Sequence, residues 1–504
     1  MTQLLHIFAK DARRLRLEIL LSLIVLVFLT WTEWKRSSPG EVPTWYEVAP
    51  LVAIALVWAF MIVRLIQSEA LVGDRQFWIT RPYIWYQLLA SKAFFVCVCV
   101  AVPLVISQLT LLILANVNIT NNISGIMSGV AGAMLVIALP AIALATITPT
   151  LARWIMYLLG AILLMGGMAW LDSKIPNSHV PNSGDVSDNL QALSFLILGA
   201  SGICLRYAKR HSPLGAVLII ASIVSIPLIM VALPYRAIIG QTFPLLNAAQ
   251  IPFKTLAQPH GQLVAKGVGK DDDTLSVDIP VQISQIPIGK LIRVEGVMLS
   301  ADGIWQSEWA PSYASLVAES GNLNLGAPIQ RTAYNQLKSE PHEFLASLAL
   351  SELSDGKRQR IMARQSFDVP EIGPCWLTDD NGLGNDIACR TTHSSPPLMM
   401  ATMNSSESTC QGGRSAPYAE EKVSRSLISD SSSEGPFSPL GLSRFYVGPI
   451  CPGTPITFST PTLTRQYRIE LPLGRLRLKE QQNSFMFGLR DYRIAVPAKK
   501  LSAP

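Results

Sequence analysis

The chain has 504 residues, of which 49% are hydrophobic and 15% are charged, and its mean hydropathy is +0.33. This composition is too apolar for an ordinary soluble enzyme. The formal net charge of +6 does not indicate nucleic-acid binding, because the basic residues of the first half lie mostly in short segments between apolar runs. These runs end near residue 235, which predicts a transmembrane domain over 1–235 and a second domain over 236–504 with a core of its own.

Seven apolar runs meet or approach the length of a membrane-spanning helix. About 20 mainly apolar residues are needed to cross about 30 Å of hydrocarbon with all backbone hydrogen bonds satisfied internally. The sixth run is the shortest, and only residues 148–150 separate the fourth from the fifth. The sequence therefore predicts an α-helical polytopic bundle of about seven spans, at 17–33, 48–67, 93–115, 124–147, 151–171, 190–205 and 214–234.

The Lys and Arg residues beside these runs are unevenly distributed. If the N-terminus is cytoplasmic, twelve of them fall on the cytoplasmic side and three on the other side. Cytoplasmic loops are enriched in Lys and Arg, so the pattern predicts a cytoplasmic N-terminus. After seven spans the second domain lies outside the membrane, and the gain or loss of one span would reverse that side.

Four of the seven cysteines lie in the second domain, and an even number there fits an oxidising compartment. Cys375 and Cys389 bracket a turn rich in Gly, Asp and Asn, which favours a local bridge between them. Three pairings of the four residues are possible, and four free thiols are the alternative. The disulfide candidates are Cys375, Cys389, Cys410 and Cys451.

The interiors of the spans hold almost no charged residues, which argues against a proton- or sodium-coupled carrier. Ser107 and Gln108 in the third span are expected to form hydrogen bonds between helices. The segment 68–92 is the most informative part of this half, because aromatic and charged residues alternate along it. One interpretation is an interfacial helix with a Trp/Tyr belt and snorkelling cations, which the physics alone favours. The other interpretation is a docking surface for a cytoplasmic partner.

Two segments carry a family resemblance. The opening HIFAKDARRLRLEILLSL resembles the amphipathic, basic N-terminal helix that leads into the first span of ABC-2 type transporter permeases, and ALVGDRQFWITRPYIWYQLLASK resembles the cytoplasmic loop of related bacterial permease-like proteins. The resemblance covers residues 1–235. It implies a protein of the bacterial cytoplasmic (inner) membrane that dimerises and works with a separate ATPase subunit. By similarity, the residues that contact the ATPase are Asp74, Arg75, Phe77, Trp78, Arg81 and Pro82.

The second domain is predicted to be mainly β, and an antiparallel sandwich with an inserted helix is the expected fold. Apolar and polar residues alternate over 275–283 and again over 467–473, as in half-buried strands, although Pro280 favours an edge position. A helix is predicted around 341–353, with Pro341 in its first turn. The segment 391–441 is rich in Ser, Thr, Pro and Gly, and is expected to be an irregular, mobile insertion.

No catalytic motif or zinc-binding spacing is found in the second domain, so the sequence predicts neither an enzyme nor a bound cofactor or metal. Gly267–Lys270 is no phosphate loop, because Val264 and Asp271 stand where the motif needs Gly and Ser/Thr. ATP hydrolysis must then come from a partner. The expected function is the permease-like subunit of an ABC-type transport system. The alternative is a non-transport membrane-anchored protein whose external β-domain binds a cell-envelope partner or a glycan.

Overall fold

The structure is a computed structural model of the chain, and its contacts divide the chain into two compact units. Unit 1 comprises 1–170, 188–231 and 358–460, and unit 2 comprises 171–187, 232–357 and 461–504. The last helix of the first half ends at Ala232 and the first strand begins at Phe253, but residues 358–460 are compact with the helices. The structure describes residues 2–480 except for 37–44, 69–84, 173–182, 210–212, 233–241, 247–252, 256–261, 268–273, 284–285, 312–315, 318–320, 379–384, 405–422, 429–436, 451–452 and positions 288, 308, 393 and 397.

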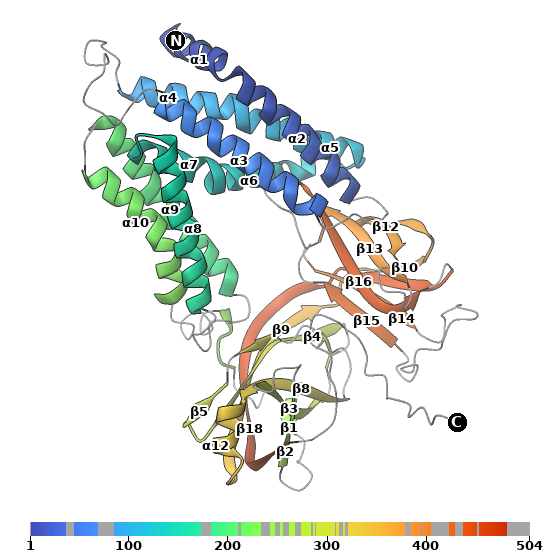
Figure 1. The fold of residues 1–504 in the computed structure, drawn as a ribbon. Helices are drawn as coiled ribbons and strands as arrows, with labels where there is room; N and C mark the ends of the chain where they lie inside the picture. Colours follow the sequence, from blue (N-terminus) through green and yellow to red (C-terminus); the bar gives the residue numbers. More distant parts are fainter. Residues whose placement is uncertain are drawn as a thin grey trace, which may run out of the picture. The chain divides into compact units, whose positions relative to one another are not determined.

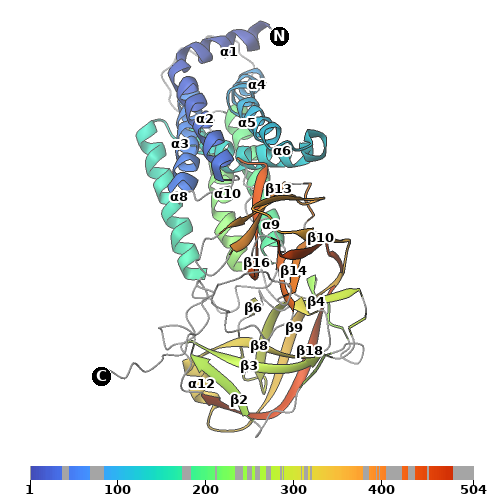
Figure 2. The same ribbon diagram turned by 90° about the vertical axis from the view of Figure 1, so that its right-hand side faces the viewer.

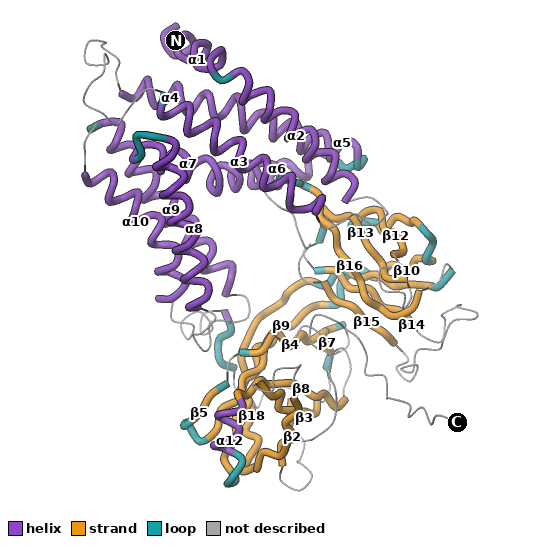
Figure 3. The backbone as a smooth tube through the Cα atoms, viewed as in Figure 1, coloured by secondary structure: helices purple, strands orange, loops and turns teal. Residues whose placement is uncertain are grey.

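Each of the seven predicted runs forms a helix (Figures 1 and 3). Five helical stretches are long and apolar enough to cross a membrane: Arg16–Lys35, Ala49–Gln67, Trp85–Leu114, Ile119–Ile147 and Leu190–Ala208. The other two apolar stretches, Leu151–Leu164 and Pro213–Ile226, are shorter. The helices are α1 (Thr2–Arg14), α2 (Arg16–Arg36), α3 (Trp45–Gln67), α4 (Trp85–Val96), α5 (Val102–Leu114), α6 (Ile119–Ala133), α7 (Leu139–Ile147), α8 (Leu151–Asp172), α9 (Ser183–Ala208) and α10 (Pro213–Ala232).

Two helical stretches contain a wider, π-helical turn. Cys97–Ala101 joins α4 to α5, and Met134–Ala138 joins α6 to α7. In each case a proline, Pro103 or Pro140, lies at the start of the following α-helix. Proline has no N–H to donate, and its ring clashes with the carbonyl four residues earlier in a regular helix. The wider turn accommodates the proline without ending the helix.

Short polar side chains join the helices of the bundle. Ser107 Oγ on α5 lies 2.7 Å from Thr30 Oγ1 on α2, which confirms the expected hydrogen bond between helices at Ser107. Trp58 Nε1 on α3 donates to Ser22 Oγ on α2 over 2.7 Å. Such bonds satisfy polar groups away from water and fix the alignment of neighbouring helices.

Helices α9 and α10 approach closely at two glycines. A methyl group added at Gly202 would lie 2.7 Å from Ile219 Cγ1 and 3.0 Å from the Gly215 carbonyl oxygen. A methyl group added at Gly215 would lie 2.9 Å from Arg206 Cγ and 3.1 Å from the Gly202 carbonyl oxygen. Small residues permit this backbone approach between membrane helices.

Replacing Gly202 with Leu is expected to force the two helices apart and to lower the stability of the bundle by about 1–3 kcal/mol, the usual cost of overpacking. The measurement is unfolding of the detergent-solubilised chain. The matched control is Gly160→Leu on α8, where an added methyl group meets nothing within 4 Å. Equal stability of the two variants would show that the close approach of α9 and α10 does not matter.

The second half is mainly β, as predicted, but its strands form three sheets instead of one sandwich (Figure 3). Two four-stranded antiparallel sheets belong to unit 1, in the orders β10-β17-β14-β15 and β11-β12-β13-β16. Side chains of both sheets meet in one core that includes Phe367, Phe445 and Phe458. The strands are β10 (Arg358–Met362), β11 (Ser366–Val369), β12 (Gly373–Thr378), β13 (Asn385–Thr392), β14 (Met399–Asn404), β15 (Val423–Ile428), β16 (Leu440–Ile450) and β17 (Pro455–Ser459).

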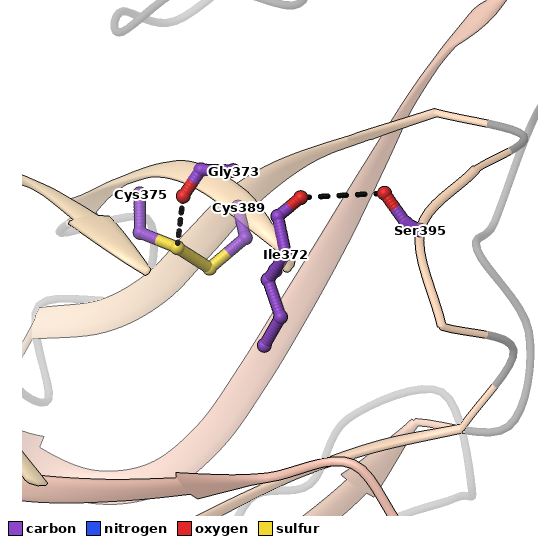
Figure 4. The surroundings of a disulfide bond; sticks show 5 residues. All are labelled: Ile372, Gly373, Cys375, Cys389 and Ser395. Carbon is purple, nitrogen blue, oxygen red and sulfur yellow. Dashed lines mark hydrogen bonds between the residues drawn. A yellow bond between two sulfur atoms is a disulfide. The ribbon is translucent and has the colours of Figure 1, made fainter. Parts of the chain in front are cut away.

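A disulfide joins Cys375 on β12 to Cys389 on β13, which confirms the predicted local bridge (Figure 4). The two residues lie directly opposite each other in the β12–β13 ladder. Cys410 and Cys451 lie outside the described residues. Gly373 begins β12 with φ +127°, and a methyl group there would lie 2.7 Å from the Arg390 carbonyl oxygen, so this position next to the bridge requires glycine.

The segment 391–441 is more regular than its composition predicts. Strand β14 and strand β15 both lie within it and pair with each other antiparallel over six residue pairs. The composition of the whole segment is misleading here because it hides the apolar run of β14, in which Met399, Ala401 and Met403 are buried. The intervening residues 405–422 are outside the described part of the chain.

Unit 2 contains a curled ten-stranded sheet with the order β1-β3-β2-β18-β9-β4-β5; β6 and β7 pair with β4, and β8 pairs with β3 (Figures 1 and 2). The short helix α12 (Arg331–Leu337) packs on the core of this sheet. The strands are β1 (Phe253–Thr255), β2 (Gln262–Gly267), β3 (Thr274–Ile283), β4 (Lys290–Ala301), β5 (Trp305–Gln306), β6 (Ala310–Pro311), β7 (Leu316–Val317), β8 (Gly321–Gln330), β9 (His342–Ser354) and β18 (Thr462–Glu480).

The predicted alternation is confirmed in β3 and β18. Leu275, Val277, Ile279 and Val281 of β3 are fully buried. Strand β3 is not at an edge, because β8 pairs along its whole length and β1 and β2 pair on the other side. Pro280 falls between the positions paired with β1 and those paired with β2, so its missing N–H is tolerated inside the sheet.

The helix predicted around 341–353 is wrong, because these residues form strand β9. The strand pairs with β4 on one side and β18 on the other. Residues 346–353 are all buried, so the strand is covered on both faces and its sequence lacks the strict alternation of a half-buried strand. Continuous apolar runs cannot be assigned to helix or strand by periodicity alone.

Glu352 on β9 is buried in unit 2 and binds two cations. Its carboxylate forms a salt bridge with Lys290, and its Oε2 accepts from Arg465 Nε over 2.5 Å. Burial alone would raise the pKa of Glu352, but the hydrogen bonds and charges of Lys290 and Arg465 outweigh burial, and the pKa lies below its usual value.

Glu352 is therefore expected to make unit 2 acid-sensitive. A carboxylate whose pKa is lower in the folded state than in the unfolded state stabilises the folded state at pH values above the unfolded pKa, which is about 4.3 for Glu. This contribution is lost as the pH falls through the pKa of the folded state. Glu352→Gln should be less stable near neutral pH, and its stability should fall less steeply below about pH 4.3. Unfolding followed against pH tests this, with exposed Glu340→Gln as the control. An unchanged acid slope in Glu352→Gln would contradict the prediction.

Candidate functional site at the polar end of the bundle

A buried ion pair holds the N-terminal helix against the bundle. Ile7 and Asp11 on α1, and Leu15 directly after it, are all buried. Asp11 Oδ2 lies 2.7 Å from Lys92 Nζ on α4, and both side chains are 3% exposed. Coulomb attraction is strong where water is excluded, so this contact fixes α1 to the first turns of α4.

A second ion pair lies where α2 and α3 meet. Glu18 near the start of α2 forms a salt bridge with Arg64 near the end of α3. The Arg64 guanidinium carbon also lies 5.8 Å from the centroid of the Phe60 ring. Arg64 is therefore paired with an acid on the neighbouring helix and also contacts an aromatic ring of its own helix.

Further polar contacts connect the ends of two more helices, α7 and α9, to this region. Gln67 Nε2 on α3 donates to Thr148 Oγ1, just after α7, over 3.2 Å. An Arg206 guanidinium nitrogen on α9 donates to the Thr146 carbonyl oxygen on α7 over 3.1 Å. We call this region the polar end of the bundle and define it by Asp11, Glu18, Arg64, Gln67, Lys92, Thr146, Thr148 and Arg206.

The predicted docking loop begins and ends at the polar end. Residues 69–84 connect α3 to α4, and the ion pairs of Arg64 and Lys92 stand on either side of this connection. The six residues predicted to contact an ATPase lie outside the described residues: Asp74, Arg75, Phe77, Trp78, Arg81 and Pro82. The structure therefore gives the anchors of the loop, and the role of the loop itself stays a prediction.

The two ion pairs were missed from the sequence, although a signal was present. Asp11 stands between Ile7 and Leu15 at spacings of four residues, so an acid interrupts the apolar face of an amphipathic helix. Such an acid requires a buried cation. The sequence could not identify Lys92 as that cation, because several basic residues precede the third span and their facing positions depend on helix packing.

A second junction lies within unit 1, between the strands and the helices. We call residues 390–392, 394–395 and 437–440 the tip. They comprise the end of β13 with two residues that follow it, and the start of β16 with the residues before it. Leu440 is 1% exposed and belongs to the core of the helix bundle. The Phe437 ring lies 5.9 Å from that of Trp58 on α3. The tip therefore packs among the helices (Figure 2).

Polar residues of the tip contact residues near the ends of α2 and α6. The Arg390 guanidinium carbon lies 4.9 Å from the centroid of the Trp34 ring on α2, and burial lowers the pKa of Arg390. The Ser394 backbone N–H donates to Asn122 Oδ1 on α6 over 3.1 Å. Ser438 Oγ accepts from the Leu440 backbone N–H, so the buried turn satisfies itself locally. These contacts leave no recognisable pattern in the sequence.

At the polar end, ion pairs and hydrogen bonds join α1 to α4, α2 to α3, α3 to the residue after α7, and α9 to α7. Within the part of the chain that the structure describes, no three His, Cys, Asp or Glu residues gather where they could hold a metal ion. A comparison with models of known protein families finds no match, and a comparison with curated proteins finds no significantly similar sequence.

Proposed function

We propose that the chain is the permease-like subunit of an ABC-type transport system, and that it works as a homodimer with a separate ATPase subunit. The Asp11–Lys92 ion pair is the observation that carries the proposal. It fixes the amphipathic N-terminal helix to the helix that follows segment 69–84. A partner that binds this segment would therefore move α1 and α4 together.

Contacts at the polar end would transmit such a movement to other helices. The Glu18–Arg64 pair ties the helix before the segment to α2, and Gln67 ties it to the end of α7. Breaking the buried Asp11–Lys92 pair would cost several kcal/mol, so α1 and α4 are expected to shift together, and the contacts of Glu18 and Gln67 extend this coupling to α2 and α7. Coupled helices of this kind are what a motor subunit needs in order to change the conformation of a membrane bundle.

The tip favours this function over the alternative of a simple anchor. A domain that only needs a membrane anchor requires no specific contacts with the helices, and one span is sufficient to hold it. Here Leu440 is part of the bundle core, and Arg390 and Ser394 contact α2 and α6. Movement of the helices would therefore reach residues 358–460.

Two observations support a location in the bacterial cytoplasmic membrane with the N-terminus inside. The basic residues gather beside the polar end, as expected for cytoplasmic loops. The Cys375–Cys389 disulfide belongs to an oxidising compartment. With the polar end inside and residues 358–460 outside, both signals agree.

The test is co-purification of an ATP-hydrolysing subunit with the full chain from its native membrane in a mild detergent. Replacing Phe77, Trp78 and Arg81 with Ala should abolish this association while leaving the chain folded. The matched control replaces Ile304, Met362 and Arg364, three exposed residues of the strand-rich half, with Ala. Absence of any ATPase from the wild-type chain, or equal association of both variants, would refute the proposal.

A further inference from the structure

Helix α1 presents opposite chemistry on its two sides. Ile7, Asp11 and Leu15 face the bundle and are buried. Arg13 and Arg14 at the end of α1 and Arg16 at the start of α2 are exposed. We call Arg13, Arg14 and Arg16 the basic face. Basic residues in the last turn of a helix also interact favourably with its dipole, but this interaction does not involve Arg16, which begins the next helix.

The positive charge of the basic face is not neutralised by the acids beside it. Asp11 and Glu18 are the only acidic residues in α1 and the first turns of α2. Both are buried, and they pair with Lys92 and Arg64 from other helices. Of the residues that the structure describes at this end, Arg153 at the start of α8 and Lys209 after α9 are further exposed cations. The surface is therefore suited to an anionic ligand.

The position of the basic face, directly beside the exposed apolar surface of α2, indicates which anionic ligand it binds. Leu17, the residue after Arg16, is 71% exposed, and Ile24 two turns further along α2 is 58% exposed. In a membrane-spanning helix, exposed apolar side chains of this kind face lipid chains. The basic face therefore begins where the hydrocarbon ends, which is the level of lipid headgroups. An acidic protein partner would not account for the direct continuity of charge with lipid-facing surface.

We propose that Arg13, Arg14 and Arg16 bind the headgroups of anionic phospholipids. Guanidinium groups bind phosphate through paired hydrogen bonds. Lipid binding would hold the exposed side of α1 at the membrane surface, while the Asp11–Lys92 pair holds its buried side against α4. The proposal does not depend on an ATPase partner.

The test uses the purified full chain in a neutral detergent, titrated with phosphatidylglycerol and separately with phosphatidylcholine, with bound lipid measured by native mass spectrometry. The wild-type chain should bind phosphatidylglycerol more tightly. Replacing Arg13, Arg14 and Arg16 together with Gln should weaken that binding about a hundredfold, since each cation near an anionic surface contributes roughly fivefold. Replacing the same three residues with Lys should retain more of the affinity than replacing them with Gln, because Lys keeps the charge but not the paired hydrogen bonds.

The control variant removes three exposed cations elsewhere, Arg364, Arg477 and Lys479, and should bind phosphatidylglycerol like the wild type. Unchanged phosphatidylglycerol binding in the Gln variant, or equally tight phosphatidylcholine binding by the wild type, would overturn the proposal. Displacement of the lipid by inorganic phosphate at matched concentration would point to a free-anion site instead. If the Gln variant bound phosphatidylglycerol normally but no longer co-purified with an ATPase, the basic face would bind a protein partner instead of lipid.

Discussion

Replacing Lys92 with Met is expected to lower the free energy of unfolding by roughly 3–5 kcal/mol, the usual cost of leaving one member of a buried ion pair without its partner. Asp11 would remain in a site where both side chains are 3% exposed. Helix α1 would then separate from α4, or the carboxylate would take up a proton. Either outcome weakens the polar end. The measurement is unfolding of the full chain in mixed detergent micelles.

A double variant separates the charge effect from the loss of packing. When Asp11→Leu accompanies Lys92→Met, no uncompensated charge remains, and apolar replacements of a buried pair are often neutral or stabilising. Stability should return to within about 1 kcal/mol of the wild type. The control is Lys479→Met at an exposed position on β18. If the single and double variants were equally unstable, the ion pair would not be what holds α1 in place.

The second large effect is expected at the tip. Leu440→Ala removes a side chain that is 1% exposed and belongs to the core of the helices, although the residue comes from a strand. Truncating a buried Leu to Ala costs about 2–5 kcal/mol, because the lost apolar contacts leave a cavity. The cost should appear in the unfolding of unit 1, where the strands 358–460 and the helices are compact together.

Leu463→Ala serves as the matched control, because Leu463 is 50% exposed on β18. Surface changes of this kind usually stay within about 0.5 kcal/mol. The comparison keeps the residue type constant and changes only its surroundings. A Leu440→Ala variant as stable as Leu463→Ala would mean that the tip does not sit among the helices in solution.

Elements with a strong periodic or compositional signal were predictable from the sequence. The seven apolar runs all form helices, and five of these are long and apolar enough to cross a membrane. The alternation at 275–283 identified β3 because one face of that strand is buried. The local spacing of Cys375 and Cys389 predicted their bridge, since β12 and β13 are consecutive strands that pair with each other.

Features that depend on contacts between distant segments were not predictable. Strand β9 is buried on both faces, so its sequence also fits a helix. Asp11 and Lys92 are 81 positions apart, and only the packing of α1 on α4 brings them together. The contacts of Arg390 and Leu440 with the helices depend on a tertiary arrangement that leaves no pattern in the sequence.

The position of residues 358–460 within the chain has a consequence for the order of folding. Ser354 at the end of β9 and Thr462 at the start of β18 are paired neighbours in the sheet, although they stand 108 positions apart. Bringing the ends of a flexible loop of that length together costs roughly 4 kcal/mol of chain entropy. If residues 358–460 fold first and hold their own ends together, most of that cost disappears before β9 meets β18. The longest ladder of unit 2 is therefore expected to close late, after the inserted strands have formed.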